Sequence, residues 1–505
     1  MLILVVHNGS HHADNVLSLA EEIVHGVSDM KLAILCESKD QARLQRSVRD
    51  PAARVLALGA HTEPVIDEAD VSRVAGAARG ALSRVSRSLL GVYSLWRKKI
   101  RGKSKLGDTL LDIIEYNSLA CLLREKRLVQ HFSAQIRDAH RVFELLQPDA
   151  VLAWGDRHVD IELPALVVAR QRNIKVLLPY VASSSYRSLL WSRKLYGGPK
   201  CWTPFSIYRL LANFRLSSLT RQGYFFQEPH VMNAMRKVGA LSSNPWTIGC
   251  GLSDIVCVDS AMTAARYCAE GVAAEKLHIV GSPEFDLLYR GLASREVLRN
   301  YIADRYQLPL GNGIIVVALP QFAEQGVLSW ENHWSEIRYI LRQLKRSGKA
   351  VLVSLHPRVE FEKYRFLEDE FGIRLSVDPL KMILPATDAF VAVNSSTLVW
   401  ATLCGIKAFM LDYYGLDASA FEKLDSITPL RNRESLYTDL MTHLDAETDF
   451  SSDWKCLSRD WVFDGNVIGR YRDLIVQNPE STSSMIAADN SLRDFLAFHT
   501  SGHGH

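Results

Sequence analysis

Residues 389–405 read AFVAVNSSTLVWATLCG. The first five residues are all apolar, which is typical of a strand buried on both faces of a parallel sheet. Ser395, Ser396 and Thr397 then precede an apolar helical run that ends before Gly405, and hydroxyl side chains in this place cap helices. The stretch is therefore a complete strand–turn–helix unit, and we predict that its strand lies inside an α/β sheet.

The same alternation of apolar runs and helical stretches extends on both sides of this unit. We expect strands at residues 2–6, 31–36, 55–58, 150–154, 175–179, 255–258, 277–280, 314–319, 350–355, 389–393 and 407–411. Helices are expected at residues 14–25, 163–172, 331–347 and 397–404, and residues 76–144 are helical in period. Residues 182–239 break the pattern and are rich in aromatics, so we interpret them as an irregular insertion.

Strands that alternate with helices predict parallel sheets covered on both faces, as in Rossmann-like folds. A chain of 505 residues is long enough for at least two domains. We predict an α/β fold with two Rossmann-like parallel-sheet domains that face each other across a cleft. The first covers residues 1–240 with helical and basic insertions, the second covers residues 241–480, and residues 481–505 form a polar tail.

The composition excludes several classes of protein. With 48% hydrophobic and 23% charged residues, the chain has an ordinary globular balance. Eight cysteines without a CxxC pair argue against a disulfide scaffold and against a zinc cluster. The apolar start MLILVVHNGS lacks a basic region before it, and no run of about 18 apolar residues occurs elsewhere. We expect a cytoplasmic protein with neither a metal site nor a cofactor.

The net charge of +3 conceals two basic segments. Residues 71–107 and residues 163–227 each hold ten Lys or Arg and no acidic residue. The second segment also interleaves aromatic residues, a combination that suits an anionic bilayer surface. The alternative is a solvated helical face next to core aromatics. No nucleic-acid-binding motif accompanies these segments, so we predict a membrane surface and not a nucleic acid as the partner.

Polar residues follow the predicted C-terminal strands at the edge where α/β sheets bind ligands. His356, Pro357 and Arg358 follow the strand at 350–355, and Ser395, Ser396 and Thr397 follow the strand at 389–393. Gln321 and Glu324 follow the strand at 314–319. An Arg fork and hydroxyls at a helix start suit a phosphate group. The alternatives are a strand-ending turn, plain helix capping and a polar loop.

The N-terminal strands end in further titratable groups. Asp156, His158 and Glu162 follow the strand at 150–154, and they are the candidate catalytic residues. The alternative is that Asp156 caps the next helix while the others face solvent. His7, Asn8 and Gly9 follow the first strand and are expected to line a cleft. Neither a Walker A motif nor GxGxxG occurs, which argues against a P-loop NTPase and a typical dinucleotide enzyme.

Residues 251–288 read GLSDIVCVDSAMTAARYCAEGVAAEKLHIVGSPEFDLL. This stretch resembles the interdomain segment of GT-B glycosyltransferases and of the related UDP-N-acetylglucosamine 2-epimerases, where an "SD" strand, an "EGV" helix end and a "VGNP…D" turn recur. The Gly155-Asp156 pair is similar to the "HGD" of the epimerases. His356-Pro357 and Ser395-Ser396 resemble the HP and SS motifs of bacterial sialyltransferases and capsule Kdo transferases.

The resemblance implies a GT-B fold whose C-terminal domain binds a nucleotide sugar and whose N-terminal domain binds the acceptor. In the sialyltransferases and Kdo transferases the HP and SS motifs hold the nucleotide and phosphate of a CMP-sugar. The "HRREN" and "VEAGLRT" segments of the epimerases are replaced here by PQFAE at residues 320–324 and PYVAS at residues 179–183. Both losses favour sugar transfer over epimerisation. The acidic motif of the sialyltransferases is not evident, so Asp156 remains the leading carboxylate, as a base or a nucleophile.

Together these observations predict a metal-independent GT-B glycosyltransferase. Its donor is a nucleotide sugar, with a CMP-sugar favoured and Kdo or a sialic-type acid as the candidate sugar. Its acceptor is a bacterial surface glycan or a lipid-linked glycan, reached from the inner face of the membrane. The alternatives are a UDP-sugar 2-epimerase or hydrolase, and a non-catalytic protein that binds a membrane or a polyanion.

Overall fold

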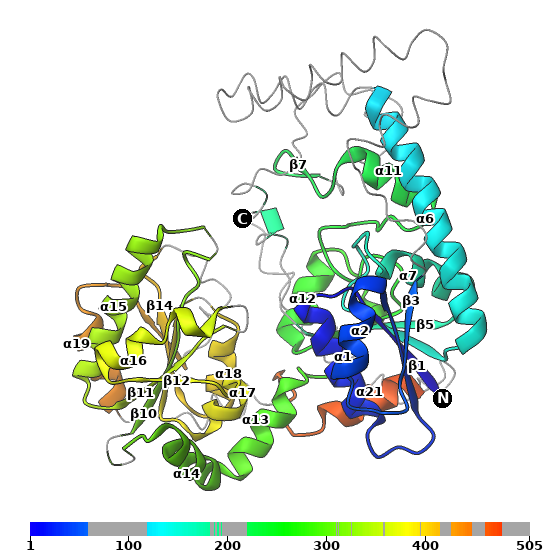
Figure 1. Cartoon of the computed structure of the whole chain (residues 1–505). Helices are drawn as coiled ribbons and strands as arrows, with labels where there is room; N and C mark the ends of the chain where they lie inside the picture. The colour runs from blue at the N-terminus through cyan, green and yellow to red at the C-terminus, as the bar shows by residue number, and fades with distance from the viewer. Residues whose placement is uncertain are drawn as a thin grey trace. The chain divides into compact units, whose positions relative to one another are not determined.

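The computed structural model describes residues 1–58, 119–181, 186, 189, 190, 193, 220–309, 311, 313–324, 326–356, 359–393, 395–414, 426–446 and 460–476. The chain forms two compact units, each built around one sheet (Figure 1). The first unit comprises Met1–Val258, Thr263–His278 and the described residues from Arg472 on. The second unit comprises Asp259–Met262 and Ile279–Tyr471.

The first unit contains a seven-stranded sheet in the order β3-β2-β1-β4-β5-β8-β9. The neighbouring pairs from β3 to β8 are all parallel. Residues 3–6 of the central strand have no exposed surface, because helices cover both faces of a parallel sheet. The strands are β1 (Leu2–His7), β2 (Lys31–Glu37), β3 (Arg54–Leu58), β4 (Ala150–Leu152), β5 (Lys175–Leu178), β8 (Ile255–Val258) and β9 (Leu277–Ile279).

Capping residues and an amphipathic pattern of side chains explain where the helices of this unit form. Helix α1 (His11–Val24) begins after Ser10, whose side chain accepts the N–H of Ala13, and its apolar face is buried on β1 and β2. The long helix α6 (Leu119–Leu146) packs on α7 and α11 (Figure 1). The other helices are α2 (Ser38–Ser47), α7 (Glu162–Gln171), α11 (Pro229–Lys237), α12 (Ala261–Ala269) and the 3₁₀ turn η1 (Ala274–Lys276).

The second unit contains a six-stranded sheet in the order β12-β11-β10-β13-β14-β15, and all its neighbouring pairs are parallel. Its strands are β10 (Ile314–Ala318), β11 (Ala350–Ser354), β12 (Arg374–Ser376), β13 (Ala389–Val393), β14 (Lys407–Leu411) and β15 (Ile427–Leu430). A buried core joins these strands to α15 (Trp330–Arg346) and α19 (Leu436–Asp445). The two units are therefore separate α/β layers of the Rossmann type.

Further helices complete the second unit. They are α13 (Glu284–Ala293), α14 (Arg295–Tyr306), η3 (Phe361–Lys363), α16 (Phe366–Phe371), α17 (Leu380–Ile383), η4 (Leu384–Ala386) and α18 (Thr397–Leu403). Helix α21 (Val467–Val476) ends in residues of the first unit. There the Arg472 guanidinium donates to the carbonyl oxygens of Glu22, Ile23 and His25, at the end of α1. These carbonyls lack partners within their own helix, so the arginine satisfies them.

The domain boundary lies later than the expected division between residues 240 and 241. Strands β8 and β9 were expected to open the second domain, but they extend the first sheet beside β5. A strand–helix alternation predicts that a strand is parallel and buried, and it does not say which of two sheets the strand joins. The C-terminal domain was also expected to run to residue 480, whereas the residues from Arg472 on belong to the first unit.

Most predicted elements are confirmed to within a few residues, including the strand and helix of residues 389–405. Strands β12 and β15 were missed, because they are short and lie at the two edges of their sheet. Several predictions lie outside the described residues. They concern the helical pattern over residues 76–118, the basic segment 71–107, the part of the 182–239 insertion before residue 220, apart from four single residues, and the tail 481–505.

Candidate functional site

In each sheet the strand order reverses once, and we call that place the reversal point. In the second unit it lies between β10 and β13. Ala318 of β10 pairs with Ser354 of β11 and with Ala392 of β13, so the three strands end level with one another. The loops that follow them therefore leave the same edge of the sheet side by side. Open α/β sheets bind ligands at this kind of place.

The loop after β13 contributes three hydroxyl groups. The Ser395 Oγ lies 2.8 Å from the Thr397 Oγ1 and accepts the Thr397 backbone N–H at 3.3 Å. Ser396 is exposed, and its side chain makes no capping hydrogen bond to α18. Plain capping therefore accounts for Ser395, and the Ser396 hydroxyl is left for another partner.

The loop after β10 places Glu324 on the surface beside this edge. A Glu324 carboxylate oxygen accepts the hydroxyl of Tyr364 at 2.6 Å, and that hydroxyl lies 2.8 Å from the His333 Nε2. Tyr364 and His333 are both buried. Gln321 of the same loop is half-buried. Tyr364 and His333 were not predicted from the sequence. His333 lies 9 residues and Tyr364 lies 40 residues after Glu324, and no local pattern connects positions with these spacings.

Aromatic side chains pack beneath the same loop. Phe322 is buried against Tyr414, with ring centroids 4.7 Å apart in an edge-on arrangement. The hydroxyls of Tyr413 and Tyr414 both donate to Glu336 of α15, at 3.0 and 2.8 Å. These bonds fix the two rings where the chain leaves β14. The Tyr413-Tyr414 pair, one residue after a predicted strand, was the sequence signal that could have revealed this packing.

The loop after β11 is described only in part. His356 is exposed and two residues beyond the end of β11. Pro357 and Arg358 lie outside the described residues, so their part in the site remains a prediction.

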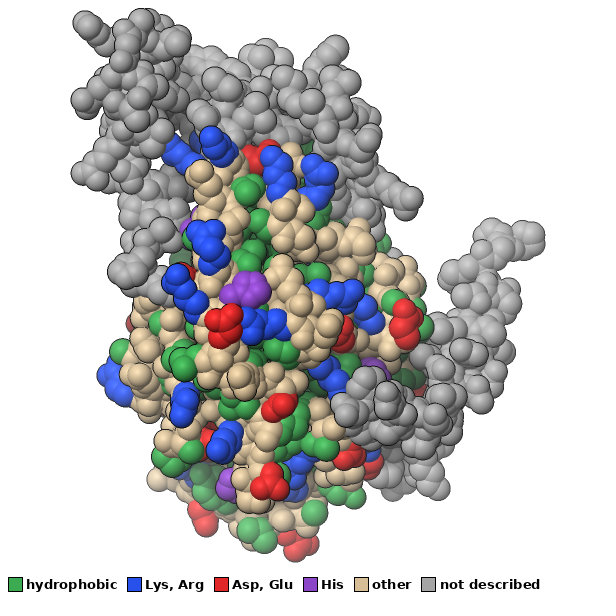
Figure 2. Space-filling model, turned by 90° about the vertical axis from the view of Figure 1, so that its right-hand side faces the viewer, with side chains coloured by type: hydrophobic (Ala, Val, Ile, Leu, Met, Phe, Trp, Pro, Cys, Tyr) green, Lys and Arg blue, Asp and Glu red, His purple; other side chains and the backbone are tan. Residues whose placement is uncertain are grey.

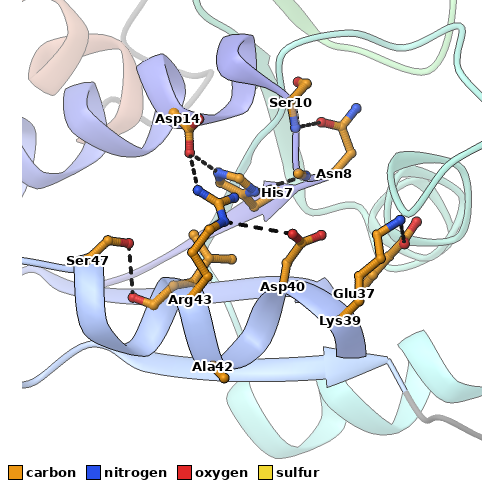
Figure 3. Close-up of polar contacts among 12 residues, drawn as sticks. His7, Asn8, Ser10, Asp14, Glu37, Lys39, Asp40, Ala42, Arg43 and Ser47 are labelled. Carbon is orange, nitrogen blue, oxygen red and sulfur yellow. Dashed lines mark hydrogen bonds and ion pairs between the residues drawn. The ribbon is translucent and has the colours of Figure 1, made fainter. Parts of the chain in front are cut away.

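The reversal point of the first unit lies between β1 and β4. His7 ends β1, and its ring is fixed on both sides (Figure 3). The Nδ1 accepts the Gly9 N–H at 3.1 Å, so the ring proton sits on Nε2, which donates to Asp14 at 3.0 Å. Arg43 donates to the same Asp14 oxygen at 3.1 Å. His7 has no exposed surface, and burial lowers its pKa.

His7 therefore lies beneath the loop and organises it, whereas we expected it to line a cleft. Asn8 accepts the Ser10 N–H at 3.1 Å and shapes the turn into α1 (Figure 3). Gly9 has a φ of +78°, and a Cβ there would lie 2.7 Å from a carboxylate oxygen of Asp40. Both the left-handed backbone and this close approach require glycine at position 9.

Asp156, the leading catalytic candidate, is buried and fully engaged. Its Oδ1 accepts the Gly249 N–H at 2.9 Å, and its Oδ2 accepts the Gly251 N–H at 2.8 Å and the Ser253 hydroxyl at 2.7 Å. These three donors come from the segment that leads into β8. The carboxylate therefore connects the loop after β4 to that segment by hydrogen bonds. The partners lie about 95 residues apart in the sequence, and no motif predicts their contact.

Glu162 opens α7 and has no exposed surface. The donors nearest to its carboxyl oxygens are the Trp154 indole N–H and the backbone N–H of Glu162 itself, and among the described residues neither oxygen makes a well-aligned hydrogen bond. Burial raises the pKa of Glu162 to about 8, with the nearby Asp160 adding to the effect. A carboxyl group with such a pKa changes its protonation state near neutrality, as acid–base groups of enzymes do.

Trp154 lies between two histidine rings. Its ring stacks on His158 at 4.3 Å between centroids and on His12 at 5.0 Å. His12 comes from the first turn of α1, so the stack joins the loops after β1 and β4. Burial and the neighbouring Arg157 lower the pKa of His158 to about 3, which keeps its imidazole neutral. Of the three catalytic candidates, His158 is the one with partly exposed surface.

The described residues hold no group of three His, Cys, Asp or Glu side chains placed to bind one metal ion. Within the same part of the chain, no helix combines the length and the apolar character that a membrane crossing needs.

Two parallel α/β sheets, each with its helices and its own reversal point, place this chain in the GT-B fold class. The structure is similar to UDP-GlcNAc 2-epimerase from Neisseria meningitidis bound to UDP-GlcNAc, with a TM-score of 0.51 and 11% identity over 95% of this chain and 100% of the other. It also matches the calicheamicin glycosyltransferase, with a TM-score of 0.49 and 12% identity over 94% and 97% of the two chains. No protein-family model and no curated protein matches the sequence.

Proposed function

We propose that this protein is a glycosyltransferase that moves a sugar from a nucleotide-sugar donor to a hydroxyl group of a bacterial surface glycan or lipid-linked acceptor. The observation that carries the proposal is the reversal point of the second unit. There Glu324, His356 and Ser396 extend from three strands that end at one level. Such a group of hydroxyl, imidazole and carboxylate side chains suits the phosphate and hydroxyl groups of a nucleotide sugar.

In this proposal the donor binds to the second unit. The hydroxyls of Ser395, Ser396 and Thr397 hold its phosphate, together with His356, Pro357 and Arg358. The positive charge of Arg358 and hydrogen bonds from these groups offset the charge that develops on the departing nucleotide. A CMP-sugar is the favoured donor because of the HP and SS resemblance, with Kdo or a sialic-type acid as the sugar. Since these side chains can serve in place of a divalent ion, we expect activity to persist in EDTA.

The first unit supplies the groups that act on the acceptor. Asp156, which we first expected to be the base or nucleophile, is better assigned to positioning, because three donors occupy its oxygens. Glu162 is the stronger candidate for the group that exchanges a proton, because burial raises its pKa to about 8, close to neutrality. Buried polar atoms without protein partners commonly bind an ordered water, so we expect the proton to pass through one. His158 then contacts the acceptor as a neutral imidazole.

The acceptor is proposed to be presented at the inner face of the membrane. Exposed basic side chains gather on α6 and α11, and Figure 2 shows Lys and Arg on the face that carries α6. We call this the α6–α11 surface; its members are Arg124, Lys126, Arg127, Arg137, Arg236 and Lys237. Clustered basic residues attract the anionic lipids of a cytoplasmic leaflet.

A ligand panel tests the proposal. The melting temperature of the full chain is measured with CMP, CDP, UDP and GDP, and we expect one of them to raise it. The matching nucleotide sugar is then incubated with the chain alone and with a glycan acceptor. Release of nucleotide that depends on the acceptor supports transfer. Conversion of the donor without an acceptor would indicate an epimerase or hydrolase, and no thermal shift with any nucleotide would contradict the proposed function.

A further inference from the structure

A chain of three hydrogen-bonded side chains reaches the reversal point of the second unit. It begins at His333 of α15, passes through Tyr364 and ends at Glu324 in the loop after β10, with distances of 2.8 and 2.6 Å. His333 and Tyr364 have exposures of 0% and 1%, whereas Glu324 is exposed. A buried pair of polar side chains thus supports one carboxylate on the surface.

The Glu324 carboxylate at the end of this hydrogen-bonded series determines which group donates in each of the two hydrogen bonds. The Tyr364 hydroxyl has one proton and donates it to the Glu324 carboxylate, so it must accept from His333. His333 therefore carries its proton on Nε2. Its Nδ1 is buried without a partner among the described residues, so a second ring proton would have no acceptor there. Burial also lowers the pKa of His333, which agrees with a neutral ring.

Aromatic packing holds the His333 and Tyr364 side chains in one arrangement. The His333 ring meets Trp330 and Trp334 edge-on, with centroids 5.5 and 4.9 Å away. Trp334 also packs against the Tyr364 ring at 4.8 Å. Glu324 is held by the buried Tyr364, so its carboxylate is preorganised, because few rotamers remain open to it when a ligand arrives.

The chemistry of a carboxylate decides what it can recognise at this edge. It accepts hydrogen bonds and repels a phosphate, so Glu324 is unsuited to the phosphate-binding role of the neighbouring Ser395–Thr397 hydroxyls. Two adjacent hydroxyl groups match its two oxygens, and such groups occur on a ribose and on a sugar. With one oxygen already bound to Tyr364, Glu324 still has free lone pairs on both atoms.

We propose that Glu324 is a specificity-determining residue that accepts hydrogen bonds from vicinal hydroxyl groups of the bound ligand, and that Tyr364 and His333 are its positioning residues. This inference rests on the proposed function, since it assumes that a nucleotide sugar binds at the second unit. The vicinal hydroxyls belong either to the ribose or to the transferred sugar.

Calorimetric titration of the full chain tests the inference. Wild type, Glu324→Gln, Tyr364→Phe and the control Glu331→Gln are titrated with CMP, CDP, UDP or GDP, with the 2′,3′-dideoxy form of each and with the matching nucleotide sugar. Glu331 is an exposed carboxylate at the start of α15, so its variant removes the same charge outside the chain of hydrogen bonds.

If Glu324 contacts the ribose, the wild type binds the ribonucleotide about tenfold more tightly than its dideoxy form. Glu324→Gln and Tyr364→Phe then reduce that ratio, while Glu331→Gln keeps it. If Glu324 contacts the transferred sugar, Glu324→Gln and Tyr364→Phe weaken the binding of the nucleotide sugar only. Nucleotide and nucleotide-sugar affinities that are the same in wild type and Glu324→Gln would overturn the inference and leave the proposed function intact. Failure of the wild type to bind any of these probes would overturn both.

Discussion

At the scale of single residues, burial separates two carboxyl groups that look alike in the sequence. Asp156 and Glu162 follow the same strand, six positions apart. Asp156 accepts hydrogen bonds from two backbone N–H groups and a hydroxyl, whereas the effect of burial on Glu162 outweighs that of the nearby Trp154 and backbone N–H donors. A carboxylate surrounded by donors is stabilised in its charged form, and one whose burial outweighs its donors is destabilised. The first therefore holds the loop and the second is able to exchange a proton.

The raised pKa of Glu162 predicts a pH-dependent stability. The folded chain keeps a proton on Glu162 up to about pH 8, whereas the unfolded chain loses it near pH 4.5. The folded state therefore loses stability as pH rises through this window, by about 1.4 kcal/mol per pH unit. Glu162→Gln cannot ionise, so its free energy of unfolding should fall less steeply between pH 5 and 8. Urea unfolding across this range measures the slope.

The control for this prediction is Glu275→Gln, which changes an exposed carboxyl group of the same unit. Its slope should equal that of the wild type. Equal slopes for the wild type and Glu162→Gln would show that the pKa of Glu162 is not raised in the folded chain, and would remove the basis for its role in proton exchange.

At the scale of elements, the sequence predicts what is local. The strand at 389–393 and its hydroxyl-rich turn were recognised because apolar runs and capping residues are neighbours in the chain. The assignment of β8 to the first sheet, the tie of Asp156 to Gly249, and the bond of Tyr364 to Glu324 join residues 40 or more positions apart. Such contacts depend on topology and packing, and with a single sequence no local pattern indicates them.

The tie between the loop after β4 and the segment before β8 predicts a structural effect of Asp156→Asn. An asparagine can keep the bonds to Gly251 and Ser253, but its amide group would then face the buried N–H of Gly249. Leaving that donor unpaired costs about 1–3 kcal/mol. We expect the free energy of unfolding to fall by this amount in urea titrations, with a smaller loss for Ser253→Ala.

A second variant tests the same hydrogen-bonded contact at the segment that leads into β8. A Cβ at Gly251 would collide with the Asp156 carbonyl oxygen, so Gly251→Ala should destabilise the chain at least as strongly. If Asp156→Asn keeps the stability of the wild type and loses its turnover, the carboxylate acts in the reaction itself, as the sequence first indicated.

At the scale of the whole molecule, charge is distributed unevenly along the chain. The two basic segments of residues 71–107 and 163–227 hold twenty of the 59 Lys and Arg residues without one acidic residue. The α6–α11 surface adds further exposed basic side chains. A net charge of +3 is too small to indicate such a surface. Local clustering of charge determines attraction to a bilayer, because screening limits each charge to about 10 Å.

The α6–α11 surface predicts salt-sensitive binding to anionic vesicles. Each Lys or Arg near an anionic bilayer contributes on the order of 1 kcal/mol. Replacing Arg124, Lys126 and Arg127 with alanine should therefore weaken binding roughly 100-fold at low salt, as measured by flotation with phosphatidylglycerol vesicles. A matched triple replacement of Arg342, Lys345 and Arg346, exposed on α15 of the second unit, removes the same charge and should leave flotation unchanged. If both triple variants float like the wild type, the α6–α11 surface is not the attachment site. If the wild type stays in the lower fraction even at low salt, a soluble acceptor or a partner protein that covers this surface becomes the better explanation.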